Sequence, residues 1–236
     1  MRNQTDLNKV KDMANIFSNM DVVASDCSFV VQHPIYEYPV VAVGFSDYDN
    51  GVQIVNILES EENLNKARQA TRETIAKAED IFSVYFVIRK SYRMTFLKYI
   101  HSYLSLEDFS KLLNYAWISS ENPNTDVNVN IRTVLSWFKK ADKKQLMNEE
   151  DYEVYNNLPE YVTLYRGVGI KSKRKGLSWT DDIEIAKWFA NRFQSNGYIL
   201  TAKVHKSKIL AYFSDRNESE YIVDVYSIDV ERLEVE

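Results

Sequence analysis

The C-terminal part of the chain consists of short apolar segments rich in β-branched and aromatic residues, a pattern that predicts strands. These segments are YVTLYRG (161–167), GLSWT (176–180), GYILTAKV (197–204), KILAYFS (208–214) and EYIVDVYSI (220–228). A single helix is expected among them, over residues 181–193. From about residue 92 to residue 158 the periodicity is helical. A helical region followed by a strand-rich region indicates an α+β fold.

The helical region is predicted to contain several helices, with Ser105 placed to cap one of them. A polar loop at 121–130 should interrupt the series. The expected helices span 92–104, 105–119, 131–141 and 148–158.

The first 99 residues predict a separate α/β unit with the order β-β-β-α-β. Asn50 and Gly51 suit a tight hairpin turn, and Ser60 is placed to cap the helix. The expected strands are 28–34, 39–45, 52–58 and 81–88, and the expected helix is 60–78. The change of pattern after this unit indicates a second domain.

The composition is that of a soluble globular protein, with 45% hydrophobic and 27% charged residues. The net charge of -5 gives no reason to expect binding to nucleic acid or to a membrane surface. Cys27 is the only cysteine, which excludes an intrachain disulfide and suits a reducing cytoplasm. The polar N-terminus has no signal-peptide pattern, and the longest apolar run is too short to span a bilayer.

Several common motifs are missing from the sequence. The three histidines, His33, His101 and His205, are isolated, so we expect no metal site and assign them structural roles. The six glycines form neither a GxGxxG dinucleotide fingerprint nor a phosphate-binding P-loop. Any nucleotide chemistry must therefore use another architecture.

Two glutamates stand one residue apart in DRNESEYIVD (215–224), where a polar turn gives way to a β-branched run. Because side chains alternate along a strand, Glu218 and Glu220 should project from the same face. Two close carboxylates repel, which raises the pKa of one of them unless a cation or a donor compensates. Taken alone, the pair is better explained as a charged strand edge that deters aggregation.

Two motifs upstream change this interpretation. Arg166 ends the strand in LYRG (164–167), and its planar guanidinium can grip a phosphate or carboxylate, or form a surface ion pair. LSWT (177–180) places Ser178 and Thr180 on one face of the next strand, although Thr180 is also well placed to cap the following helix.

In this order, LYRG, LSWT and ESEYIVD (218–224) resemble the Arg-Ser-Glu class of mono-ADP-ribosyltransferases. This family includes bacterial binary toxins, vertebrate ecto-enzymes and phage-encoded host modifiers. The resemblance covers about residues 100–236, which would form an ADP-ribosyltransferase-like domain. Residues 1–99 match nothing we know and would be an accessory domain of unknown role. It implies a split β-sandwich with a preceding helical lobe, around a cleft that binds NAD without a Rossmann motif.

The resemblance also implies a role for each matching residue. Glu220 would be the catalytic carboxylate, hydrogen-bonded to the nicotinamide ribose and stabilising the positive charge that develops on the sugar. Glu218 would engage the acceptor, and a glutamate there is characteristic of arginine-modifying members. Arg166 would hold the NAD phosphates and ribose. Ser178 would orient Glu220, and Thr180 would take the third place of the Ser-Thr-Ser motif.

The chain also departs from the family pattern. Trp179 replaces the small middle residue of Ser-Thr-Ser. Phe189 and Arg192 stand where several toxins keep a nicotinamide-stacking aromatic and a phosphate-binding arginine, although Phe189 also belongs to an apolar helical stripe. Either Tyr212 or Phe213 is expected to offer an exposed aromatic to the acceptor, with the other in the core.

The sequence thus predicts an NAD-dependent mono-ADP-ribosyltransferase, a glycosyltransferase that modifies a protein arginine. An NAD glycohydrolase with the same cleft and an inactive binding or phage module are the alternatives. The expected partners are NAD, as a substrate, and an acceptor protein, without nucleic acid or membrane. The expected location is the cytoplasm of a bacterial or phage-infected cell, as toxin, effector or regulator, in an oligomeric state that the sequence leaves open.

Overall fold

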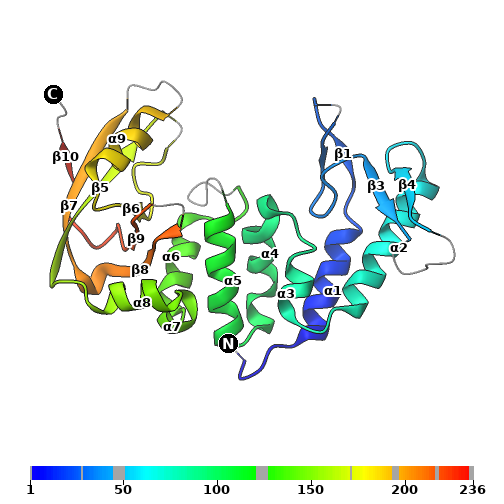
Figure 1. Ribbon diagram of the computed structural model, residues 1–236, viewed down its shortest axis with the longest axis horizontal. Helices are drawn as coiled ribbons and strands as arrows, with labels where there is room; N and C mark the ends of the chain where they lie inside the picture. Colours follow the sequence, from blue (N-terminus) through cyan, green and yellow to red (C-terminus); the bar gives the residue numbers. More distant parts are fainter. Residues whose placement is uncertain are drawn as a thin grey trace. The chain divides into compact units, whose positions relative to one another are not determined.

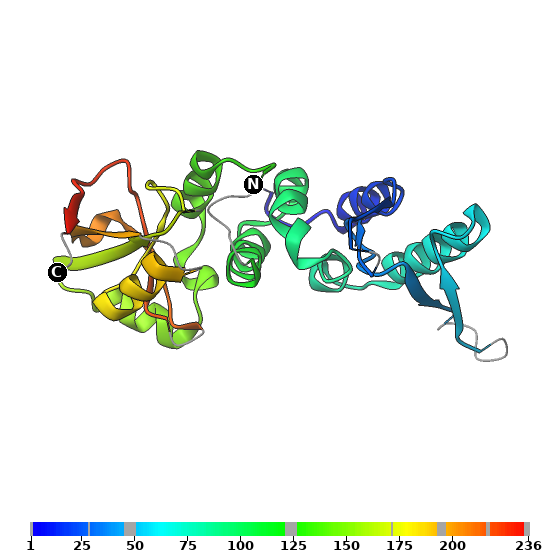
Figure 2. The same ribbon diagram turned by 90° about the horizontal axis from the view of Figure 1, so that it is seen from above.

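The computed structural model describes residues 2–27, 29–44, 51–120, 127–170, 172–192, 197–215 and 218–233. The chain forms two compact units, Met1–Asp108 and Phe109–Glu236 (Figures 1 and 2). Helices and antiparallel strands are both present, as an α+β fold requires. The predicted hairpin turn before Gly51 and most of the predicted loop at 121–130 lie outside the described residues.

The unit Met1–Asp108 combines helices with two small antiparallel sheets, β1–β2 and β3–β4. Its elements are α1 Leu7–Ser18, β1 Val23–Ala24, β2 Val31–Gln32, β3 Val40–Val43, β4 Gln53–Asn56, α2 Glu61–Lys77, α3 Ile81–Tyr85, η1 Lys90–Tyr92, α4 Arg93–Ile100 and η2 His101–Tyr103. Figure 2 shows α2 beside the β3–β4 hairpin, and Val43, Val55 and Ala67 share one buried cluster there. Ser60 caps α2 as predicted, because its hydroxyl oxygen accepts from the Asn63 backbone N–H at 3.2 Å.

The order β-β-β-α-β predicted for this unit is wrong at both ends. Residues 81–85, expected as a buried strand, form helix α3, which the Asp80 carboxylate caps by accepting from the Ser83 backbone N–H at 2.8 Å. Ile81, Val84 and Tyr85 are buried at helical spacing, so the apolar run fills one helix face rather than two strand faces. Helix α1, which was not predicted, buries Val10 and Phe17 on its apolar stripe.

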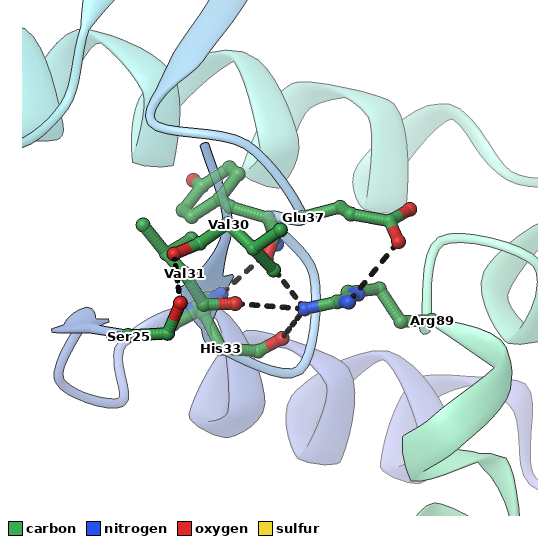
Figure 3. A network of polar contacts seen from close by, with 7 residues as sticks. Ser25, Val30, Val31, His33, Glu37 and Arg89 are labelled. Atoms are coloured by element: carbon green, nitrogen blue, oxygen red, sulfur yellow. Dashed lines mark hydrogen bonds and ion pairs between the residues drawn. The ribbon is translucent and has the colours of Figure 1, made fainter. Parts of the chain in front are cut away.

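Arg89 fixes the loop between β2 and β3 in the first unit (Figure 3). Its Nη1 donates to the carbonyl oxygens of Val31, His33 and Tyr36 at 2.9, 3.3 and 3.1 Å, while Nη2 lies 3.3 Å from the Glu37 carboxylate. His33 is fully buried, and its Nδ1 accepts from the backbone N–H groups of Ile35 and Tyr36. Burial lowers the pKa of His33 to about 4, so this histidine is neutral and structural, as predicted.

The unit Phe109–Glu236 contains two three-stranded antiparallel sheets, β10-β7-β5 and β6-β9-β8. Its elements, with α5 starting just before the boundary, are α5 Leu106–Ser119, α6 Ile131–Lys140, α7 Lys143–Leu146, α8 Glu149–Asn156, β5 Tyr161–Val168, β6 Ser178–Trp179, α9 Ile183–Asn191, β7 Tyr198–His205, η5 Lys206–Lys208, β8 Ile209–Phe213, β9 Glu220–Val223 and β10 Glu231–Leu233. The five predicted strands and the helix among them are confirmed, and a bridge between Tyr165 and Thr180 joins the two sheets. This bridge sets β5 beside the end of β6.

Helix α9 lies against β5 and β7 (Figure 1). Its cap is Asp182, whose carboxylate accepts from the backbone N–H groups of Glu184 and Ile185, so the alternative that Thr180 caps the helix is wrong. The helix approaches β5 at Gly167, where an added Cβ would stand 2.1 Å from the Ala186 carbonyl oxygen. Across the described part of the chain, helices reach neither the length nor the apolarity needed to cross a membrane.

Candidate active site

Arg166 lies near the end of β5 and is buried, with 8% of its surface exposed. Its Nη1 donates to the Ser178 carbonyl oxygen at 2.6 Å, and its Nη2 donates to the Lys173 carbonyl oxygen at 3.0 Å. These bonds tie β5 to β6 and to the loop between them. Burial lowers the pKa of Arg166 to about 10, against the opposing effect of the Glu220 charge, so the guanidinium remains a cation at neutral pH.

The loop before β6 closes over this guanidinium. Gly176 is buried there, and a Cβ at this position would stand 1.9 Å from Nη2 of Arg166. Only glycine lets the chain pass this close to the guanidinium without a shift of Arg166. Trp179, the departure from the Ser-Thr-Ser pattern, is buried and donates its indole N–H to the Gly176 carbonyl oxygen at 3.2 Å. Trp179 therefore helps to hold the same loop.

Glu220 is the first residue of β9 and is partly buried. The Ser178 side chain and the Trp117 indole N–H both hydrogen-bond to its carboxylate, and Trp117 Nε1 lies 3.1 Å from Oε1. Burial raises the pKa of Glu220, and the negative charge of Glu218 adds to this increase. The two hydrogen bonds and the positive charge of Arg166 act in the opposite direction.

Glu218 lies close enough to Glu220 for its charge to matter, but it is not on the strand. Strand β9 begins at Glu220, and the Glu218 backbone N–H donates to the Asp215 carbonyl oxygen at 3.2 Å. The prediction that strand alternation puts both carboxylates on one face is therefore wrong.

The remaining predicted residues are Thr180, Phe189 and Arg192, which lie before, within and directly after α9. Thr180 is buried, and its hydroxyl oxygen accepts from the Asp182 backbone N–H at 3.1 Å, so it shapes the entry into the helix. Phe189 is half-buried, with its Cβ over Gly167 and its ring edge-on to Trp188 at a centroid distance of 4.8 Å. Arg192 is exposed and stacks its guanidinium over Trp188 at 5.2 Å. These contacts tie Phe189 to Trp188 and β5, and they tie Arg192 to Trp188.

An exposed aromatic from β8 was expected to face the acceptor, and this expectation is wrong. Tyr212 is 9% exposed and Phe213 is 1% exposed. The Tyr212 ring packs edge-on against Tyr221 at 5.0 Å, and the Tyr221 hydroxyl donates to Asp181 at 3.0 Å. Both β8 aromatics therefore belong to the packed interior of this unit.

Trp117 is the site residue that the sequence did not reveal. It lies on the buried face of α5, together with Phe109, Leu112, Leu113 and Ala116. A buried indole N–H needs an acceptor, which is the one signal that the sequence held. The identity of that acceptor, more than a hundred residues away in Glu220, depends on the tertiary fold.

Among the described residues there is no group of three or more His, Cys, Asp or Glu side chains that could hold a metal ion. An open pocket of about 690 Å³ in the unit Met1–Asp108 is lined by residues of that unit, including Arg2, Asp80 and Glu107, and contains none of the predicted site residues. The sequence matches no family model, and neither a curated protein nor a solved structure shows significant similarity to it. The functional inference therefore rests on the residues and their geometry.

Proposed function

We propose that this chain is an NAD-dependent mono-ADP-ribosyltransferase that transfers ADP-ribose to a protein arginine and releases nicotinamide. The observation that carries the proposal is the convergence of three strands on one carboxylate. Ser178 of β6 hydrogen-bonds to Glu220 of β9, and Arg166 of β5 is near enough for its charge to act on that carboxylate. These are the three residues that the family pattern requires, in the required order.

The donors of Arg166 suit a substrate that carries phosphates. A guanidinium has five N–H donors, and the two bonds described above use one donor on each Nη nitrogen. The Nε atom of Arg166 is buried and has no protein acceptor. Phosphate oxygens are natural acceptors for a guanidinium, and the retained positive charge of Arg166 favours them further.

The carboxylate of Glu220 suits the bond-breaking step. In the proposed reaction the bond between the ribose anomeric carbon and the nicotinamide nitrogen breaks, and its electron pair leaves with nicotinamide. Positive charge develops on the ribose, and a carboxylate already held by two donors stabilises this charge without reorganising. The anionic form of Glu220 is the active form.

The acceptor completes the reaction. A guanidinium nitrogen of the acceptor arginine forms the new bond to the anomeric carbon, and its proton passes to Glu218 as the general base. Hydrolysis of NAD in the same cleft is the alternative. The position of Glu218 before β9, rather than on the strand, keeps this alternative open, because water needs no fixed acceptor glutamate.

The test uses purified protein, NAD and agmatine, a small guanidinium acceptor, with nicotinamide and ADP-ribosylated agmatine measured by mass spectrometry. Wild type should form both products, and Glu220→Gln should lose both by about 100-fold or more. Glu218→Gln should keep nicotinamide release and lose the agmatine adduct. Glu231→Gln, the same chemical change at an exposed position of β10, is the control and should behave as wild type.

Each other outcome has a definite meaning. Nicotinamide release without any adduct on agmatine or on proteins of a host lysate would support the hydrolase. No release, together with no NAD binding in calorimetry, would overturn both enzymatic functions.

A further inference from the structure

We propose that Trp117 of helix α5 is a positioning residue for the Glu220 carboxylate, an inference that rests on the proposed function and adds a residue to its site. The indole N–H of Trp117 donates to Oε1 of Glu220 at 3.1 Å. The side chain is 1% exposed, so water cannot compete easily for this donor. A hydrogen bond from a buried donor to a carboxylate is stronger than a bond between neutral groups.

The second observation is a closed circuit of contacts within this unit that links Trp117 back to Glu220. Its ring packs edge-on against Phe138 of α6, at a centroid distance of 5.1 Å and an interplanar angle of 87°. Phe138 contacts Phe213 of β8 at 6.4 Å, and Phe213 is the cross-strand partner of Glu220. These contacts lead from Glu220 through Trp117, Phe138 and Phe213 back to Glu220. They therefore limit the motion of the carboxylate.

Trp179 shows the ordinary solution for a buried indole N–H in the same unit. Its Nε1 donates to the Gly176 carbonyl oxygen, a backbone acceptor that is always available. Trp117 instead uses one oxygen of an ionisable side chain, and that oxygen belongs to the proposed catalytic residue. The bond from Trp117 therefore restricts the rotation of the Glu220 carboxylate. If Trp117 donated to a backbone carbonyl instead, the carboxylate would not be restricted in this way.

The charged and polar groups that act on Glu220 fix the direction of a pH effect. Glu218 disfavours the anion, while Arg166, Ser178 and Trp117 favour it. Tyr198 acts on Glu220 only indirectly, because its charge raises the pKa of Arg166. Removing the Trp117 donor takes away one of the groups that favour the anion, so the acidic limb of the activity profile should move to higher pH.

The test compares Trp117→Phe with Trp137→Phe. Trp137 is also buried, on α6, and packs edge-on against Phe109, so its replacement makes a cavity of the same kind without removing the hydrogen bond to Glu220. We expect Trp117→Phe to lower kcat for nicotinamide release by about 10- to 100-fold, the effect of losing one bond to a charged group. KM for NAD should stay within about threefold of wild type, because uniform binding is not removed.

A second substitution separates the hydrogen bond from the packing. Replacing Trp117 with benzothienylalanine keeps the ring shape and exchanges the N–H for sulfur. This protein should fold as wild type does, yet show the kcat loss and the shift of the acidic limb. In a Glu220→Gln background, Trp117→Phe should cause little further loss, because the two residues act as one unit.

The readouts also separate this inference from the proposed function. A ¹³C NMR titration of glutamate-labelled protein, with the Glu220 signal assigned by its absence in Glu220→Gln, should give a higher pKa for Glu220 without the Trp117 donor. That shift is measurable even if NAD is never cleaved, in which case only the proposed function fails. If NAD is cleaved but benzothienylalanine changes neither kcat nor the Glu220 pKa, Trp117 is an ordinary core residue and this inference is wrong.

Discussion

At the scale of single residues, the groups around Glu220 shift the pKa of its carboxyl group in opposite directions. Burial and Glu218 raise its pKa, while Ser178, Trp117 and Arg166 oppose the rise without cancelling it. A carboxylate with a raised pKa in the folded state contributes stability that is fully present below its unfolded pKa. That stability is lost as the pH rises through the folded pKa. Above the folded pKa the ionised Glu220 therefore costs the fold stability.

Glu220→Gln should consequently stabilise the protein at neutral pH while it abolishes activity. The gain in the free energy of unfolding is expected to be about 1 kcal/mol, the usual size for relieving a strained functional position. Urea unfolding at several pH values measures it. The gain should vanish below about pH 4.3, the ordinary glutamate pKa, where both side chains are neutral, and a loss of stability at neutral pH would contradict this assignment of charges.

Glu218→Gln should move the acidic limb of nicotinamide release to lower pH, because it removes the negative charge that helps to raise the pKa of Glu220. The shift is opposite in sign to the one expected for Trp117→Phe. Rates of nicotinamide release from acid to neutral pH measure both. Shifts of the same sign in the two variants would show that the acidic limb does not report Glu220.

At the scale of secondary-structure elements, the site depends on how β5, β6 and β9 are held together. The Tyr165–Thr180 bridge joins the two sheets, and α9 covers β5 at Gly167. The part of β5 that carries Arg166 is therefore held by backbone packing and not only by side chains. A change at Gly167 acts on that packing directly.

Gly167→Ala should destabilise this unit by about 1–3 kcal/mol, the usual cost of overpacking, because its Cβ would stand 2.1 Å from the Ala186 carbonyl oxygen. Thermal unfolding of the variant measures the cost. Thr163→Ala, at an exposed position of the same strand, is the control and should change stability by less than about 0.5 kcal/mol. Equal behaviour of the two variants would mean that α9 does not pack on β5 as described.

The sequence predicted most elements of the second unit because their signals are local. Each strand there is a short β-branched or aromatic run, and α9 has an acidic start and an apolar stripe. One error occurred where a local pattern had two solutions. IFSVYFVI (81–88) satisfies both a buried strand and a buried helix, and the Asp80 cap favours the helix. Trp117 could not be found, because its acceptor is distant along the chain.

At the scale of the whole molecule, all the residues of the proposed site belong to one unit. Trp117, Arg166, Ser178, Glu218 and Glu220 lie within Phe109–Glu236. The unit Met1–Asp108 has its own buried cluster, which includes Val31, Tyr36 and Ile57. The fold thus separates the residues proposed for chemistry from those of the first unit, whose role stays a prediction.

A fragment that spans 105–236 and keeps Ser105 as the cap of α5 should therefore fold cooperatively and release nicotinamide from NAD. Circular dichroism and the nicotinamide assay measure this. A folded fragment without activity, beside an active full-length protein, would show that the first unit contributes directly to the reaction.

We propose that the cluster of Arg166, Ser178 and Glu220 breaks the bond between ribose and nicotinamide in NAD. The most direct test is a single-turnover measurement of nicotinamide release by the full-length protein and by Glu220→Gln, at equal NAD occupancy established by calorimetry. The proposal predicts release by the wild type and a loss of about 100-fold or more in the variant. Equal rates in the two proteins, or NAD binding without any release by the wild type, would contradict it.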